Sequence, residues 1–152
     1  MEFQIIMSFT EAITTCSIKK FATISGRATR AEFWWFVLFC FLTRVVLAIC
    51  LYFLIIDLPA SSQGFFSPYF AFFLKLFLII LSLLIMFVVL VIPEFCVTIR
   101  RLHDVGYDGS QFLVKAIPIA GIIWLIKDLC QPSDPNDNAF GPNPFTIPQT
   151  SN

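Results

Sequence analysis

Charged residues are scarce in this chain. Lys, Arg, Asp and Glu make up only 13% of the 152 residues, whereas 58% are hydrophobic; an average soluble domain is about 25% charged. No charged residue occurs from Leu76 to Pro93. With its apolar flank from Tyr69, this stretch would form a helix about 36 Å long, enough to cross a hydrocarbon core of ~30 Å. The shortage of charge excludes an ordinary soluble domain and predicts an all-α membrane protein.

Sequence motifs for catalysis, metal binding and nucleic-acid binding are also missing. His103 is the only histidine, and the five cysteines form no CxxC pair and leave one over, so neither a closed metal site nor a disulfide framework is expected. No Ser-His-Asp set and no phosphate-binding glycine loop can be assembled. The net charge is zero, which suggests no nucleic-acid partner. We therefore expect a protein that is not an enzyme and has no cofactor.

The hydrophobic pattern predicts three membrane spans. Thr29 and Glu32 fit a capping box at the start of the first span, and Trp34 and Trp35 suit the headgroup boundary. The third stretch has a short uncharged centre, so a re-entrant or interfacial helix is its alternative. The expected segments are an N-terminal interfacial amphipathic helix within 1–24, a membrane domain at 25–130 with spans at about 33–56, 69–92 (continuing past Pro93 toward His103) and 112–130, and an irregular Pro-rich tail at 131–152.

The basic residues predict the orientation in the membrane. Lys19, Lys20, Arg27 and Arg30 precede the first span and Arg100 and Arg101 follow the second, whereas the 57–68 loop and the tail contain no Lys or Arg. The positive-inside rule then places the N-terminus in the cytoplasm. With three spans, the tail emerges outside the cell. A cleaved signal peptide is excluded because its basic region would be too long.

Two charged residues are predicted within the bilayer. Arg44 lies roughly 14 to 15 Å beyond the two tryptophans and Glu94 roughly 9 Å before Arg100 by helical rise. An unpaired charge at such depth costs about 2.5 to 3.5 kcal/mol, so we expect an Arg44–Glu94 ion pair between the first two spans. The pair has two interpretations: it holds the helices together, or it takes part in transport or a proton relay.

A second polar group is predicted on the cytoplasmic side, where Arg100 and Asp104 would share a helix face. It has three interpretations: an interhelical network that sets helix packing, a site for anionic headgroups, or a catalytic or metal site. We favour non-enzymatic binding of lipid headgroups or a protein partner. The alternative is a minimal oligomeric transporter or channel that uses Arg44, Glu94 and a helix break at Pro118–Gly121. The expected binding residues are Arg27, Arg30, Glu32, Arg100, Arg101, His103 and Asp104.

Three blocks of the chain resemble the YhaH-type family of small bacterial inner-membrane proteins. The blocks are Ser25–Trp34, Arg100–Gly106, and Ile117 through Cys130 to the Phe140–Pro144 element. The resemblance implies a cytoplasmic N-terminus, a few inner-membrane helices and a short Pro-rich tail. It implies no reaction, because the activity of the family is not established. Ser110 and Gln111 depart from the tandem Trp frequent in the family, and Arg44 and Glu94 are not among its hallmarks.

Overall fold

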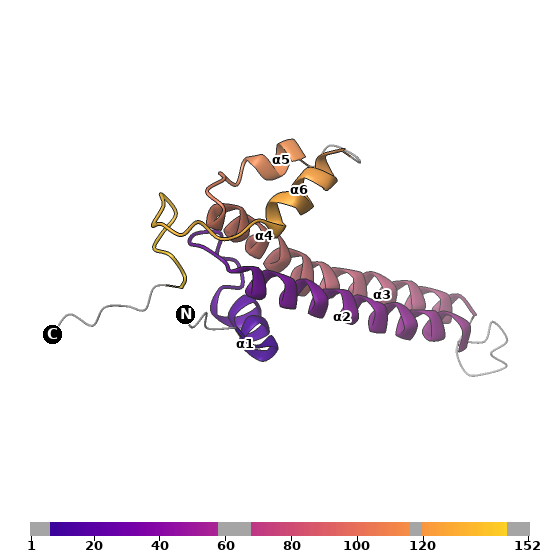
Figure 1. Ribbon diagram of the computed structural model, residues 1–152. Helices are drawn as coiled ribbons and strands as arrows, with labels where there is room; N and C mark the ends of the chain where they lie inside the picture. The colour runs from indigo at the N-terminus through magenta and orange to yellow at the C-terminus, as the bar shows by residue number, and fades with distance from the viewer. Residues whose placement is uncertain (1–6, 58–67, 116–119, 146–152) are drawn as a thin grey trace. The chain divides into compact units, whose positions relative to one another are not determined.

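The computed structural model describes residues 7–57, 68–115 and 120–145 of the chain, and within them it is helical (Figure 1). The described residues contain no strand, and only an isolated bridge joins Asn138 to Gly141. The elements in chain order are α1 (Phe9–Thr14), η1 (Thr15–Lys19), α2 (Arg30–Asp57), α3 (Pro68–Met86), η2 (Phe87–Val91), α4 (Ile92–Asp104), α5 (Gln111–Lys115) and α6 (Ala120–Cys130).

A capping box starts the N-terminal helical segment. The Ser8 hydroxyl accepts a hydrogen bond from the Glu11 backbone N–H, and the Glu11 carboxylate accepts one from the Ser8 N–H at 2.9 Å. The Ser8 N–H and, at 2.8 Å, the Ser8 hydroxyl both donate to the Glu11 carboxylate and hold the pKa of Glu11 below its ordinary value. Ala12 and Cys16 face inward, whereas Ile18 is exposed. The interfacial amphipathic helix predicted within 1–24 stays a prediction.

One of the two hydrogen bonds of the predicted capping box is present at the start of α2. The Thr29 hydroxyl accepts a hydrogen bond from the Glu32 backbone N–H at 3.1 Å, as expected for an N-cap residue. The Glu32 side chain has a different role: its carboxylate pairs with Arg100 on α4. Helix α2 runs for 28 residues and covers the whole first span predicted at 33–56.

The second predicted span, 69–92, is also helical, and the helical run continues past Pro93 as predicted. A π-helical turn, η2, ends two residues before Pro93. Proline has no N–H and its ring clashes with the carbonyl four residues earlier, so a local change to wider hydrogen bonding is a usual response inside a helix. The turn therefore lets the chain pass a proline without ending the helix.

Gly106 follows the end of α4 in a tight turn. Its φ angle is +86°, a left-handed conformation that glycine adopts without strain. The Gly106 N–H donates to the His103 carbonyl at 3.1 Å and the Tyr107 N–H to the Leu102 carbonyl at 3.0 Å, as in a Schellman-type helix end. The turn separates α4 from α5.

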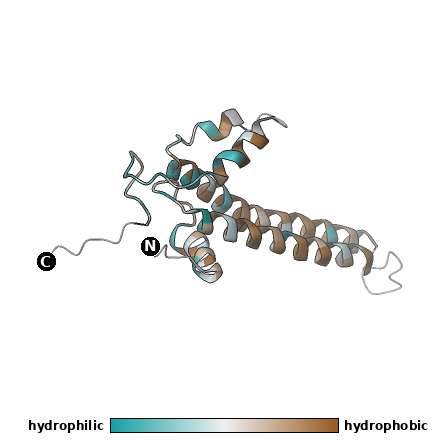
Figure 2. Cartoon of the chain, viewed as in Figure 1, coloured by the Kyte–Doolittle hydropathy of each residue, from teal (hydrophilic) through white to brown (hydrophobic). Residues whose placement is uncertain are grey.

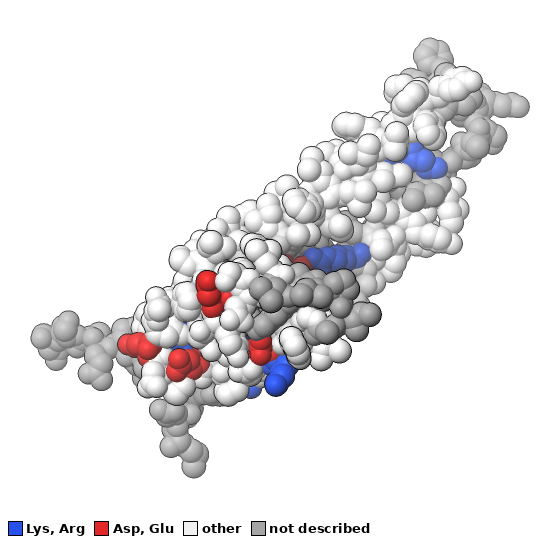
Figure 3. Space-filling view, turned by 90° about the horizontal axis from the view of Figure 1, so that it is seen from above, with Lys and Arg blue, Asp and Glu red and all other residues white. Residues whose placement is uncertain are grey.

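The chain divides into two compact units, 1–37 with 92–152 and 38–91. The second unit contains most of α2, together with α3 and η2, and its large apolar side chains, Phe53 and Phe73 among them, are mostly exposed. Figure 2 shows hydrophobic residues along α2 and α3, and Figure 3 shows a face that is largely uncharged. A soluble monomer rarely exposes apolar surface on this scale. The exposed apolar surface of this unit is typical of a protein surface that contacts lipid.

Two helical runs of the described chain, Arg30–Phe53 and Phe72–Asp104, are long and apolar enough to cross a membrane. The predicted third span is not confirmed. Its region holds the 5-residue α5 and the 11-residue α6. Of the predicted break at Pro118–Gly121, Pro118 and Ile119 lie outside the described residues.

The tail contacts two of the predicted binding residues. Residues 131–145 form turns without helix, and their backbone carbonyls accept hydrogen bonds from Arg27 and Arg101. Groups in hydrogen-bond contact cannot lie on opposite sides of a bilayer, so these contacts disagree with a cluster inside the cell and a tail outside it; the side on which the tail lies stays a prediction.

Candidate functional site

Asp104, the last residue of α4, is the centre of a buried ion-pair cluster in the first unit. Its carboxylate accepts hydrogen bonds from Arg27 Nε at 2.9 Å, from Arg101 Nη1, and from the Ser133 hydroxyl at 2.5 Å. The side chains of Asp104 and Arg101 are fully buried and that of Arg27 nearly so. We call Arg27, Arg101, Asp104 and Ser133 the Asp104 cluster.

Other donors of both arginines bind the backbone at the end of α6 and in the tail. Arg101 donates to two carbonyls there and Arg27 to two others, while Arg27 Nη2 also lies 3.4 Å from the Asp104 carbonyl. The Asp104 carbonyl accepts from the Asp134 N–H at 3.0 Å. The accepting carbonyls belong to Leu129 (3.1 Å from Arg101 Nε), Gln131, Asp134 (2.6 Å from Arg27 Nη2) and Asn136 (2.8 Å from Arg27 Nη1). Guanidinium groups suit this task because each has five donors in a fixed plane. The cluster therefore fastens the tail to the end of α4.

Arg100 belongs to a second group, formed with Glu32 and Cys16. Arg100 Nη1 lies 2.5 Å from Glu32 Oε1, and the Cys16 sulfur lies 3.6 Å from both side chains. Burial raises the pKa of the Cys16 thiol to about 12, and the nearby negative charge of Glu32 acts in the same direction. A thiol that stays protonated is a weak nucleophile, so Cys16 has a packing role. We call these three residues the Glu32 cluster.

His103 makes a third set of contacts, which join Gly26, in the loop before α2, to the tail. Its ring stacks on Phe140 with centroids 4.0 Å apart and planes 3° from parallel, and Nδ1 lies 3.3 Å from the Gly26 carbonyl oxygen. The Asn138 side-chain amide donates to the His103 carbonyl at 2.9 Å. His103 is therefore used in packing. Among the described residues, no group of three His, Cys, Asp or Glu could hold a metal ion.

Six of the seven predicted binding residues are brought together and buried in this unit: Arg27, Glu32, Arg100, Arg101, His103 and Asp104. Arg30 differs, because it is exposed in the first turn of α2. The three buried arginines donate mainly to internal carboxylates and carbonyls; of the described buried polar side-chain atoms, only Arg100 Nε has no hydrogen-bond partner. This arrangement matches the interhelical-network interpretation and leaves few donors for an external ligand.

Arg44 lies on α2 and Glu94 in the first turn of α4, both on helices as predicted. Their pairing stays a prediction. Sequence reasoning missed Cys16 and the tail residues Ser133, Asn138 and Phe140. The sequence offered no signal for the tail contacts, because most of the acceptors are backbone carbonyls.

The sequence profile described as "Protein of unknown function (DUF805)" matches residues 21–142. The chain belongs to the DUF805 family. The matched residues include all four residues of the Asp104 cluster and the His103–Phe140 stack, but not Cys16. The three blocks that carry the family resemblance thus meet in one place, since Arg27, Asp104 and Phe140 each come from a different block.

Two relatives from Escherichia coli (strain K12) are similar over most of the chain. "Inner membrane protein YhaH" is 27% identical over 131 residues, which cover 86% of this chain and 94% of the relative. "Inner membrane protein YhaI" is 27% identical over 127 residues, which cover 84% and 90%. No solved structure matches the chain.

Proposed function

We propose that this DUF805 protein is a non-enzymatic inner-membrane protein that binds anionic lipid headgroups beside its buried clusters. The inner-membrane location is supported by the names of its relatives and by two helical runs that could cross a bilayer. The positive-inside rule assigns the end with Arg27, Arg30, Arg100 and Arg101 to the cytoplasm. The leaflet on that side is rich in anionic lipid.

The residue that we propose to bind the headgroup is Arg30, in place of the buried arginines. Arg30 and Trp34 are four residues apart on α2, both are exposed, and residues at this spacing share a helix face. An exposed cation beside an exposed indole fits the headgroup region, because tryptophan prefers the membrane interface and arginine forms bidentate bonds with phosphate. This pair is the observation that carries the proposal. Arg27, Arg100 and Arg101 hold the fold and do not contact the ligand.

The test measures lipid binding to the purified full chain in nanodiscs that contain different fractions of phosphatidylglycerol. Arg30→Gln should weaken the preference for this lipid about fivefold, since one cation near an anionic surface is worth about 1 kcal/mol. Arg30→Lys should keep most of it, and the exposed Asp137→Asn serves as control. An unchanged preference in Arg30→Gln would overturn the proposal. Copurification of a stoichiometric protein in place of lipid would favour the partner-binding alternative.

Transport is not proposed as a second function. Arg44 and Glu94 lie on helices, but the helix break on which the transport interpretation depends lies mostly outside the described residues. No described contact favours a transport path over a structural role for these two charges.

A further inference from the structure

The segment between α4 and the tail leaves the Asp104 cluster and returns to it. Asp104 ends α4, and its carbonyl accepts a hydrogen bond from the Asp134 N–H at 3.0 Å. Arg101 Nε donates to the carbonyl of Leu129, near the end of α6, at 3.1 Å. Both ends of the segment are thus fixed within one turn of α4. A segment that starts and ends at one place cannot finish on the far side of a bilayer.

The helices within this segment are too short to cross a membrane. Helix α5 has 5 residues and α6 has 11, which correspond to about 8 and 16 Å by helical rise, against ~30 Å for the hydrocarbon core. The two helices contact each other, and α6 also contacts α4. Phe112 of α5 meets Phe95 of α4 edge to face, with ring centroids 5.2 Å apart. The segment is therefore a short hairpin packed on α4.

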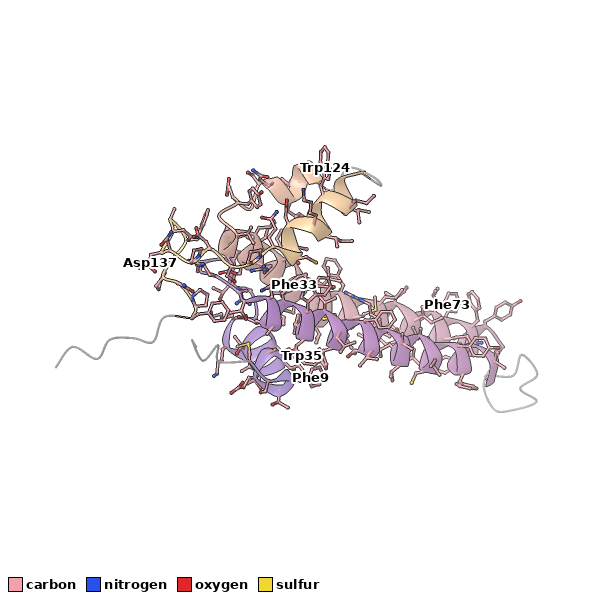
Figure 4. All side chains as sticks on the ribbon, viewed as in Figure 1. Phe9, Phe33, Trp35, Phe73, Trp124 and Asp137 are labelled. Carbon is pink, nitrogen blue, oxygen red and sulfur yellow. The ribbon has the colours of Figure 1, made fainter. Side chains whose placement is uncertain are left out.

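The hairpin exposes several large apolar side chains. Trp124 on α6 (Figure 4) is 64% exposed and Leu113 on α5 is 73% exposed. The exposed set on α6 is Ile122, Ile123, Trp124 and Ile126. Only the C-terminal end of α6 is tied to the cluster, where Leu129 is buried and the Gln131 amide donates to the Asp128 carboxylate at 2.8 Å.

Lipid is the occupant that these features favour. The same unit exposes Trp34 and Trp35 at the start of α2, which marks it as lying at the membrane boundary, where tryptophan is enriched. Lys127 is exposed and follows Ile123 and Trp124 at helical spacing, so its ammonium can reach headgroups while the apolar side chains lie deeper. An apolar helix face with a flanking cation is typical of helices that lie in the interface.

We propose that α5 and α6 form a re-entrant hairpin that inserts Ile122, Ile123, Trp124 and Ile126 among the acyl chains of the leaflet beside the Asp104 cluster. This inference rests on the proposed membrane location but not on headgroup binding. The hairpin enters and leaves on one side, and the chain crosses the membrane twice.

Depth-dependent fluorescence quenching tests the hairpin. The full-length W34F/W35F variant leaves Trp124 as its only indole and is reconstituted in zwitterionic phosphatidylcholine vesicles, so that loss of headgroup binding cannot affect the result. Lipid brominated near the top of its acyl chains should remove most of the Trp124 fluorescence, and aqueous iodide should remove little. The matched control adds W124F and A139W, which moves the indole to an exposed tail position; it should show the reverse.

Two results would overturn the hairpin proposal. Quenching of Trp124 by iodide as strong as at position 139 would place α6 in water. Resistance to both quenchers, together with chemical crosslinking between chains, would show that a second copy covers α6. If W34F/W35F does not fold, the difference in bromolipid quenching between the natural chain and W124F measures the same contribution.

Discussion

Removing the charge of Asp104 should release the tail from the end of α4. Asp104→Asn keeps the side-chain shape but leaves Arg27 and Arg101 with one neutral partner in place of a carboxylate that accepts three side-chain hydrogen bonds. Breaking a buried ion pair by removing one partner costs about 3 to 5 kcal/mol. Since total stabilities are commonly ~5 to 15 kcal/mol, and about 1.4 kcal/mol is tenfold, a loss near 3 kcal/mol raises the open population by roughly two orders of magnitude.

Trypsin reports this opening directly, because it cleaves after arginine and both Arg27 and Arg101 are buried. In detergent or nanodiscs, the natural chain should be cleaved after exposed residues such as Lys19, and the Asp104→Asn variant also after Arg27 and Arg101. Asp108→Asn is the matched control, since Asp108 is exposed and surface substitutions usually change stability by less than about 0.5 kcal/mol. Protection of Arg27 and Arg101 in Asp104→Asn equal to that in the natural chain would refute the reasoning.

Three further predictions concern the other buried or intramembrane groups. Glu32→Gln leaves Arg100 without its carboxylate and should lower the unfolding temperature of the detergent-solubilised chain clearly more than Glu11→Gln; an equal shift would contradict the Glu32 cluster. The raised pKa of Cys16 keeps its thiol protonated when folded, whereas the unfolded thiol ionises near pH 9, so stability should fall as pH rises above 9. Mass spectrometry should accordingly find Cys16 unmodified by iodoacetamide at pH 8.5 until the protein is denatured, and early labelling of the folded chain would count against this. For Arg44 and Glu94, each single reversal should reduce the yield of folded protein and the double reversal restore it, while equal yields of all variants would remove the pair.

The sequence predicted the parts of the fold that depend on local chemistry. The absence of charge from Leu76 to Pro93 predicted the second long helical run. Thr29 predicted the start of α2. Each of these signals acts within one helix or turn, so the surrounding structure does not alter it.

The choice of ion-pair partners could not be predicted in the same way. Arg100 and Asp104 are at helical spacing, yet Arg100 pairs with Glu32 and Asp104 with Arg101 and Arg27. Spacings of three and four residues both bring side chains together on a helix, and tertiary contacts decide between them. The network was one of the three interpretations of the sequence, but its pairs depend on how α2 and α4 pack.

The contacts of the tail with the buried arginines could not be predicted from the sequence. Its proline content and lack of cations indicated an irregular segment, and the predicted third span placed it outside the cell. The groups that hold the tail are mostly backbone carbonyls, at Gln131, Asp134 and Asn136 among others. Every residue has a carbonyl, so no residue type marks such a site in the sequence.

The sidedness of the two chain ends tests the account most directly, since everything depends on the tail being bound to the arginines next to the first two spans. Green fluorescent protein and alkaline phosphatase are fused in turn to each end of the chain and produced in bacteria. The predicted result is that green fluorescent protein fluoresces and alkaline phosphatase is inactive at both ends of the chain. An active phosphatase at the C-terminal end, with the N-terminal end in the cytoplasm, would contradict the Asp104 cluster, the hairpin and the two-pass arrangement together.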